Sequence, residues 1–235
     1  TNSIIIGHQT TGTLDAAERN TAVGIGSLDA ITSGDRNTAI GHKALTSNTT
    51  GSDNTASGDY SLYANTTGGK NTASGEYSLF GNSLGNYNTA SGYYSLSNNT
   101  TGNYNTASGS NSLQQNTTGG SNTASGYASL NANTTGGSNT ALGYTAGDVI
   151  TTGSNNVLIG KGADPSANNA TNQIVIGASA VGAGDNTVQL GNTSITNVKT
   201  SGSITAGAIT IPNTDGSANQ VLKTDGSGTL SWTAN

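Results

Sequence analysis

The chain has 235 residues, of which 31% are apolar and 8% are charged, and its formal net charge is −5. Its seven Lys and Arg residues are scattered, so it lacks the clustered cations that bind a nucleic-acid backbone. There is no cysteine for disulfides or thiolate metal sites, and no run approaches the ~18 apolar residues of a membrane span.

The sequence is organised as a seventeen-residue repeat. A glycine returns at this interval from Gly7 to Gly177, and the triplet Asn-Thr-Ala, a leucine and a second glycine recur in the same phase. A short fixed period indicates a repeat architecture in which each unit covers its neighbour. The polar composition alone is typical of a disordered segment, but disorder gives no reason for residue columns to stay in phase. We therefore expect a folded solenoid.

One central unit, residues 54–70, reads NTASGDYSLYANTTGGK. The runs Asn-Thr-Ala-Ser and Tyr-Ser-Leu-Tyr are short, and each ends in turn-forming residues, which predicts two strands and two turns. No run of ten residues carries the apolar period of a helix. The sequence therefore predicts an all-β fold, a parallel β-solenoid of twelve coils, with neighbouring coils about 4.8 Å apart and a length of roughly 55 Å.

The first strand changes character along the chain. It reads Thr-Ala-Ser in the centre but becomes fully apolar at residues 4–6, 157–159 and 174–176. Because adjacent strand residues point to opposite faces, three large apolar residues in a row imply burial on both faces. A central coil also buries little beyond one leucine, worth roughly 1.5–3 kcal/mol, whereas ordering seventeen residues costs on the order of 25 kcal/mol. We therefore expect an obligate oligomer.

The repeat ends near residue 191. The last glycine step, from Gly177 to Gly191, shortens to fourteen residues, and looser apolar alternation over 193–211 predicts further strands. We therefore expect a solenoid domain over residues 1–191 and a C-terminal β segment over 192–235.

A hairpin is predicted within this C-terminal segment. Residues 221–224 and 229–232 flank Asp-Gly-Ser-Gly, and glycine admits the positive φ that such loops need. We expect Trp232 to cover this hairpin.

The repeat resembles that of known fibrous proteins. The strand motifs NTAIG at 37–41, NVLIG at 156–160 and QIVIG at 173–177 resemble the head repeats of trimeric autotransporter adhesins. The longer unit at 88–104 and the tail at 213–232 are similar to segments of phage tail fibres. The resemblance implies a left-handed β-roll with three chains side by side. It also implies an extracellular location, on a virion tail or a bacterial surface, and binding to a surface glycan or a host receptor.

Tyrosines form the most prominent side-chain columns. Flat aromatic ladders suit stacking against sugar rings, so these residues are the candidate ligand contacts. The alternative interpretation is that stacked coils bring identical rings into contact with each other and so stabilise the fold without a ligand. The columns are Tyr60, Tyr77 and Tyr94; Tyr87 and Tyr104; and Tyr93, Tyr127 and Tyr144.

Catalytic and metal-binding patterns are weak. His8 and His42 share a column with Asp59 and Glu76, so a cation between neighbouring coils is conceivable, but a cluster with metal-ligand spacing is missing. The histidines show no nucleophile–base arrangement, and paired carboxylates on the face of a rod lack a cleft. The sequence therefore predicts no enzyme, no metal and no cofactor.

Regular threonine pairs offer a second hypothesis, since they resemble the ranks of ice-binding solenoids. The other interpretation of Asn-Thr-Thr-Gly is turn chemistry, in which the hydroxyls bond the local backbone. The same motif creates most of eight Asn-x-Ser/Thr sequons, including those at Asn48, Asn65, Asn116 and Asn133. The pairs are Thr49–Thr50, Thr66–Thr67, Thr100–Thr101, Thr117–Thr118 and Thr134–Thr135.

Together these observations predict a structural segment of a trimeric extracellular fibre that projects or forms a receptor-binding surface, either a phage tail fibre or a bacterial adhesin. The alternatives are a monomeric ice- or surface-binding solenoid and a self-assembling filament subunit. A filament is possible because the terminal coil of a solenoid is an open sheet edge.

Overall fold

The computed structural model describes residues 3–6, 17–199, 220–224 and 230–234. The chain divides into two units, Thr1–Thr196 and Asn197–Asn235, and each is described by itself. In the described part of the chain no helix is long and apolar enough to cross a membrane.

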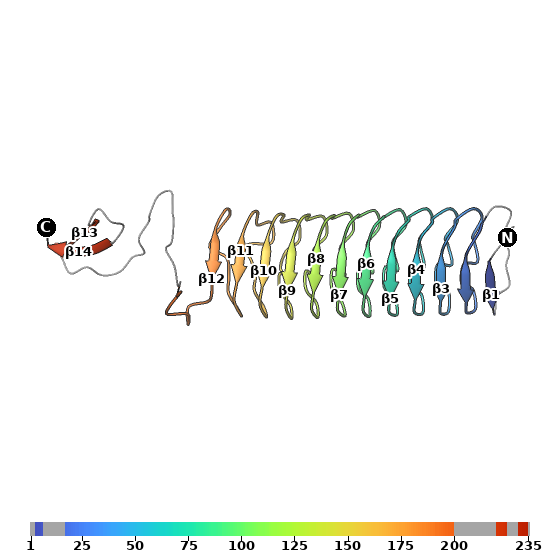
Figure 1. Ribbon diagram of the computed structural model, residues 1–235, viewed down its shortest axis with the longest axis horizontal. Coiled ribbons are helices and arrows are strands. Elements are labelled where there is room, and N and C mark those ends of the chain that lie inside the picture. Colours follow the sequence, from blue (N-terminus) through green and yellow to red (C-terminus); the bar gives the residue numbers. More distant parts are fainter. Residues whose placement is uncertain (1–2, 7–16, 200–219, 225–229, 235) are drawn as a thin grey trace. The chain divides into compact units, whose positions relative to one another are not determined.

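Twelve three-residue strands form one parallel sheet in which each strand pairs only with its neighbours in sequence (Figure 1). Equivalent residues of successive coils stand opposite each other, as Ala56 does with Ala73. The first unit is therefore a parallel β-solenoid, as predicted, with about ten seventeen-residue coils against the twelve coils of the prediction. The strands are β1 (Ile4–Ile6), β2 (Thr21–Val23), β3 (Thr38–Ile40), β4 (Thr55–Ser57), β5 (Thr72–Ser74), β6 (Thr89–Ser91), β7 (Thr106–Ser108), β8 (Thr123–Ser125), β9 (Thr140–Leu142), β10 (Val157–Ile159), β11 (Ile174–Ile176) and β12 (Val188–Leu190).

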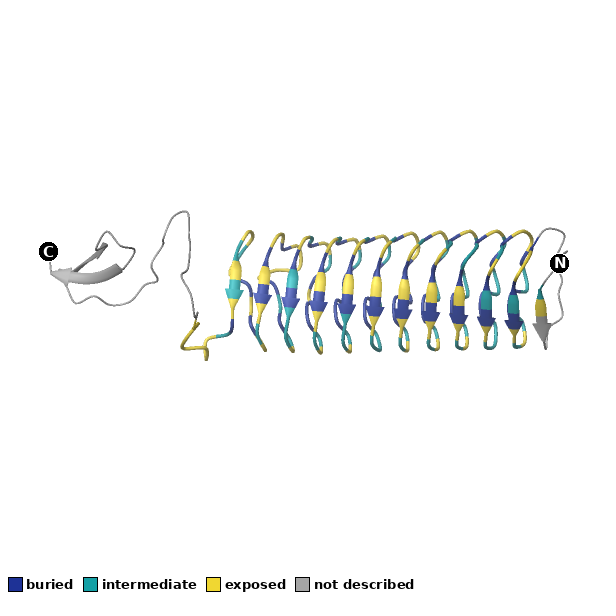
Figure 2. Ribbon diagram, in the orientation of Figure 1, coloured by how far each residue is buried: buried dark blue, intermediate teal, exposed yellow. Residues whose placement is uncertain are grey.

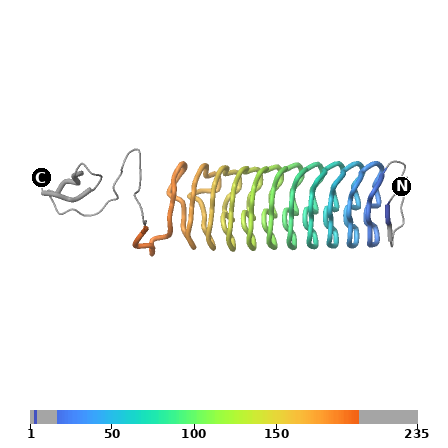
Figure 3. The backbone as a smooth tube through the Cα atoms, in the orientation of Figure 1, coloured from blue at the N-terminus to red at the C-terminus, as the bar shows by residue number. Residues whose placement is uncertain are grey.

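Each coil has one strand, not the two that were predicted. Residues Tyr60 to Tyr63 form turns, and both Tyr60 (φ 55°) and Leu62 (φ 50°) adopt the left-handed conformation, which no strand residue has. The backbone still bonds to the neighbouring coils, because Leu62 N–H donates to Ser78 C=O over 3.0 Å. The left-handed residues cost about 1 kcal/mol each, and they bend the chain back within the coil so that Leu62 is fully buried. Figure 3 shows the resulting loops, which repeat one shape along the solenoid.

Strands β2 to β11 bury their central residue and direct its two neighbours outward (Figure 2). In β4, Ala56 is fully buried while Thr55 and Ser57 are exposed. The same holds for the apolar strand β11, in which Ile174 and Ile176 are 37% and 39% exposed. No other segment of the described chain covers this outer face, so its burial against a partner chain stays a prediction.

The interior combines a narrow apolar column with polar columns. A central coil buries Ala56 and Leu62 together with Asn54, Ser61 and Asn65. Each buried asparagine is bonded to its neighbours; Asn54, for example, donates from Nδ2 to Asn37 Oδ1 and to Gly68 C=O. Because the apolar column is thin, hydrogen bonds between coils contribute strongly to specifying the fold.

The first glycine column follows each strand where the coils touch most closely. At Gly92, φ is +136°, and an added Cβ would lie 2.6 Å from the carbonyl carbon of Gly109 in the next coil. Both the backbone conformation and the lack of space require glycine, which explains the unbroken period of the column.

The C-terminal region differs from its prediction in part. Residues 193–199 form no strand, and Ile195 N–H closes a turn onto Asn192 C=O at 3.1 Å. Ile195 and Val198 are both exposed, so their alternation does not reflect burial. The rest of the predicted strand region, 200–211, lies outside the described residues.

The predicted hairpin is present. Strand β13 (Gln220–Thr224) pairs antiparallel with β14 (Leu230–Ala234), and residue 222 stands opposite residue 232. The connecting residues 225–229 and the side-chain packing of Trp232 lie outside the described part of the chain.

Candidate binding surfaces

The tyrosines of the first column stack on one another. The ring centroids of Tyr60 and Tyr77 are 5.2 Å apart with planes at 6°, and those of Tyr77 and Tyr94 are 4.8 Å apart at 20°. A second, shorter ladder of Tyr63 and Phe80, 5.1 Å apart at 7°, runs beside the first. Sequence reasoning missed this ladder because its column holds only two aromatic residues.

The rings of His42 and Tyr93 contact the two ends of the first tyrosine stack. His42 meets Tyr60 edge-on at 5.0 Å, and Tyr93 meets Tyr94 edge-on at 4.5 Å. Burial among these neighbours raises the pKa of both Tyr77 and Tyr93. The rings therefore contact each other, as the stabilising interpretation predicted, and the faces of the central rings are covered.

The other tyrosines form separate pairs. Tyr87 and Tyr104 stack at 4.9 Å, and Tyr127 and Tyr144 stack at 5.2 Å. Tyr104 is the most exposed of all the described tyrosines at 62%. The eight candidate residues thus fall into three groups along the solenoid and do not form one continuous surface.

The described histidine, His42, belongs to no metal-ligand cluster among the described residues. His42 uses its backbone N–H to bond the Asp59 carboxylate at 3.1 Å, while its ring contacts Tyr60. No group of three or more His, Asp or Glu residues able to hold a metal occurs among the described residues. His8 lies outside them.

The threonine pairs are part of the turn, but they bond the next coil and not their own turn. The Thr49, Thr66 and Thr117 hydroxyls donate to backbone carbonyls one coil further on, at 3.0, 3.1 and 3.0 Å. The second threonine of each pair is exposed. The position of the pairs in a turn is therefore confirmed, but the expectation that these hydroxyls bond the local backbone is wrong.

The sequon asparagines at Asn48, Asn65, Asn116 and Asn133 are fully buried. The Nδ2 of Asn65, for example, donates to Asn48 Oδ1 at 2.8 Å and to Gly68 C=O at 2.9 Å. A glycan on this nitrogen is incompatible with the folded coil.

The outward face of the sheet is a regular surface that runs along all twelve strands of the solenoid. From β2 to β12, no outward-facing strand residue is charged. Strands β4 to β8 present threonine and serine in two parallel columns, whereas the flanking strands present larger apolar residues. The exposed apolar members include Val23, Ile40, Leu142, Ile174, Ile176, Val188 and Leu190.

A pair of acidic residues, Asp148 and Asp164, was not noticed in the sequence because they stand in different columns. Burial and the neighbouring Asp148 carboxylate raise the pKa of Asp164 to about 6, although backbone N–H groups of Gly147 and Asp148 oppose the change. Burial also raises the pKa of Asp148. The Oδ1 of Asp164 is buried without a hydrogen-bond partner among the described residues.

A charged column precedes the Tyr87–Tyr104 pair. Arg36 holds the Asp53 carboxylate with two hydrogen bonds, Nε to Oδ1 at 2.5 Å and Nη2 to Oδ2 at 3.0 Å. In the next coil Lys70 Nζ donates to the Tyr87 hydroxyl at 2.9 Å and lies 4.8 Å from the centre of its ring. The hydrogen bond from Arg36 lowers the pKa of Asp53, and the hydrogen bond to Tyr87 raises the pKa of Lys70.

Comparison of the chain with protein-family models, with curated proteins and with solved structures finds no match.

Proposed function

We propose that this chain is a structural segment of an extracellular fibre in which three copies pack together through the outward faces of their sheets. The observation that supports this proposal is the uncharged sheet face, whose apolar residues remain exposed in the single chain. The left-handed winding and the three-fold arrangement belong to the proposal and come from the resemblance of the repeat.

The chemistry of the face suits an interface. Interface cores are depleted of charged residues, and apolar burial contributes about 25 cal/mol per Å². The outward pairs of β10 to β12 would supply this burial at one end of the face, and Val23 and Ile40 would supply it near the other. Between them, the Thr and Ser hydroxyls of β4 to β8 offer donors and acceptors to a facing copy.

Sedimentation equilibrium tests the proposal through the mass of the purified chain. A trimer has ~69 kDa, three times the 23.1 kDa of one chain. Ser91→Lys places a charge in the middle of the face and is expected to give a folded monomer. Thr101→Lys, on an exposed turn, adds the same charge elsewhere and should leave the trimer intact. A folded monomer of the unaltered chain would exclude the trimeric fibre, and masses growing beyond a trimer would favour a filament subunit.

The same face supports a second candidate, a monomeric ice- or surface-binding solenoid. In β4 to β8 the exposed Thr and Ser of one strand stand about 6.7 Å apart and recur every ~4.8 Å on a flat sheet. The strand face suits this activity better than the Thr-Thr-Gly turns, whose first hydroxyl is bonded to the next coil. Thermal hysteresis from a monomer, abolished by Ser91→Lys, would favour this candidate, because a trimer would bury the hydroxyl columns.

A further inference from the structure

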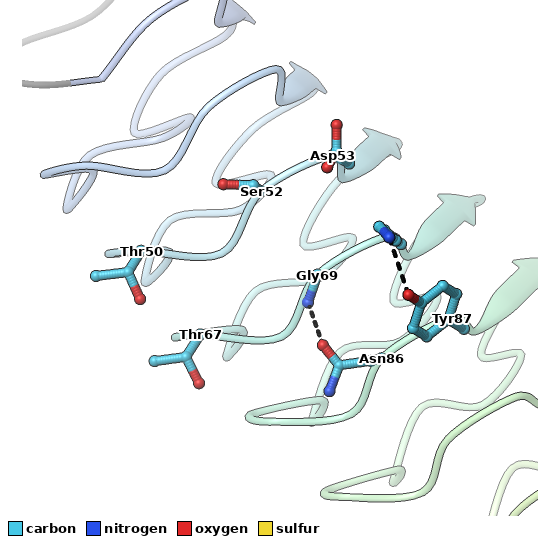
Figure 4. Close-up of a pocket in the computed structure, with 8 residues that line it drawn as sticks. Thr50, Ser52, Asp53, Thr67, Gly69, Asn86 and Tyr87 are labelled. Atoms are coloured by element: carbon cyan, nitrogen blue, oxygen red, sulfur yellow. Dashed lines mark hydrogen bonds between the residues drawn. The ribbon is translucent and has the colours of Figure 1, made fainter.

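A shallow depression of about 280 Å³ is lined by residues of the charged column and of the neighbouring turns (Figure 4). Thr50 and Thr67 lie on one rim and Tyr87 on the other, and Asp53 and Lys70 also line the depression. Gly69 forms part of its floor, with Asn86 and Ser52 on either side of it along the column.

The depression exists because a side chain is missing at Gly69. In the column that contains Asp35, Ser52, Gly69 and Asn86, a side chain usually accepts a hydrogen bond from the backbone N–H of the equivalent residue in the previous coil. Asp35 N–H donates to Ser52 Oγ at 3.0 Å, and Gly69 N–H donates to Asn86 Oδ1 at 2.8 Å. Gly69 has no such group to offer Ser52, whose N–H therefore has no acceptor in the described part of the chain. A Cβ added to Gly69 would lie 3.7 Å from that nitrogen and 3.0 Å from the Ser52 carbonyl oxygen, so both backbone groups of Ser52 border the hollow.

A cation stands beside this free N–H. The Asp53 carboxylate is already held by Arg36, and Lys70 forms no ion pair within the described residues. The Lys70 ammonium has three protons and gives one to the Tyr87 hydroxyl, so donors remain for a ligand. The depression therefore combines hydrogen-bond donors with an ammonium group that is outside any ion pair of the described residues, while the Asp53 carboxylate that also lines it is held by Arg36, and this combination favours a carboxylate.

The rims of the depression can contact parts of a ligand other than its carboxylate. The hydroxyls of Thr50 and Thr67 point outward in successive coils, as Figure 4 shows, and they bond no other described group. Hydroxyls at this spacing can bond the hydroxyls of a sugar, and the edge of Tyr87 provides apolar contact. The volume is at the small end of ligand sites, which suits a single ring, and the open side leaves room for a chain to continue.

We propose that this depression binds an acidic monosaccharide unit, with its carboxylate on Lys70 and the Ser52 N–H and its ring hydroxyls on Thr50 and Thr67. The site lies within one chain, so it does not depend on the proposed trimer.

Calorimetric titration of the full chain with three probes tests this assignment. Glucuronate carries both the ring and the carboxylate, glucose only the ring, and acetate only the carboxylate. We expect glucuronate to bind with a Kd on the order of 1 mM, and glucose and acetate to bind at least about tenfold more weakly, a difference of ~1.4 kcal/mol. If acetate bound as tightly as glucuronate, the site would recognise only the carboxylate. If glucose bound as tightly as glucuronate, Lys70 would have no role in binding. Either result, or no binding of glucuronate, overturns the proposal.

Two variants locate the site, and a third serves as the matched control. Lys70→Gln should weaken glucuronate binding at least about tenfold. Gly69→Asn, which introduces the residue of the next two coils, should abolish binding by filling the hollow and capping Ser52 N–H. Gly120→Asn makes the same change in the same column, where no lysine is adjacent, and should leave binding unchanged. In ¹⁵N spectra glucuronate should shift the Ser52 amide signal. Unchanged binding in both site variants would place the ligand elsewhere.

Discussion

Asn82 donates from Nδ2 to the Oδ1 of Asn65 in the preceding coil over 2.8 Å, and both side chains are fully buried. The same nitrogen donates its second hydrogen to Gly85 C=O at 3.0 Å, and Asn82 Oδ1 accepts from Asn99 at 2.7 Å. One amide thus bonds the coils on both sides and the turn of its own coil. A carboxylate cannot replace it, because both partners of Nδ2 are acceptors.

Asn82→Asp is therefore expected to destabilise the solenoid by about 3 kcal/mol or more, since it removes two donors and buries a charge against two oxygens. Asn98→Asp is the matched control: it makes the same chemical change on an exposed side chain and should alter stability by less than about 0.5 kcal/mol. Denaturant unfolding of the two variants measures the difference. Similar losses in both would show that the buried amide column contributes little.

The seventeen-residue period was sufficient to predict the parallel solenoid, because a column such as Leu62, Leu79 and Leu96 has a simple geometric meaning. The hairpin was predictable for a similar reason, since turn-forming residues lie between two strand-compatible runs. Tyr60 to Leu62 was predicted as strand because its residues favour strands. Backbone propensity could not show that two of these residues adopt left-handed conformations to close the coil.

The site was less predictable than the fold. Repetition placed the tyrosines in columns and so predicted that their rings would meet. Repetition could not indicate that the backbone N–H of Ser52 has no acceptor among the described residues. The reason is that the relevant feature is the side chain that Gly69 lacks in the adjacent coil. Asp148 and Asp164 also come together only through the winding of the chain.

The glycine after each strand should be intolerant of any side chain. Gly92→Ala combines a φ of +136° with a Cβ only 2.6 Å from Gly109, so a loss above about 3 kcal/mol is expected. Gly162 provides the comparison, because its φ of +57° is one that other residues adopt in this column and its Cβ would meet only Thr145 Oγ1 at 3.9 Å. Gly162→Ala should cost about 1 kcal/mol. If thermal unfolding gave equal losses, close contact between coils would not explain the glycine column.

The central ring of the first tyrosine column should contribute most to stability. Tyr77 contacts Tyr60, Tyr94 and Phe80, with centroids 4.8 to 5.5 Å apart, and each such pair is worth about 0.5–1.5 kcal/mol. Tyr77→Asn introduces the residue that stands at position 111 of the same column, and it should cost about 2 kcal/mol.

Tyr104→Ser is the matched comparison for Tyr77→Asn. It likewise introduces a residue from its own column, the serine at position 121, but it removes only one ring contact from an exposed position. The expected loss is below about 1 kcal/mol, measured in the same unfolding experiment. A greater loss for Tyr104→Ser than for Tyr77→Asn would contradict the stabilising role of the central stack.

Asp164 should make the solenoid less stable as the pH rises. Because its pKa is raised to about 6 in the folded chain, ionisation costs more there than in the unfolded chain. The contribution of Asp164 to stability is then greatest below about pH 4, falls between pH 4 and 6, and remains lower above. Each pKa unit corresponds to about 1.4 kcal/mol, and solvent near this half-buried side chain should reduce the total to about 1–2 kcal/mol.

Asp164→Asn removes this ionisation. The variant should gain about 1–2 kcal/mol over the unaltered chain at pH 8 and lose the slope between pH 4 and 6. Asp185 supplies the opposite case, since the N–H of Thr171 lowers the pKa of its carboxyl, so its contribution is present at neutral pH and lost on acidification below about pH 4. Asp185→Asn should therefore flatten only the acid end of the stability curve. Parallel curves for Asp164→Asn and the unaltered chain from pH 4 to 8 would show that Asp164 ionises in the folded solenoid as easily as in the unfolded chain.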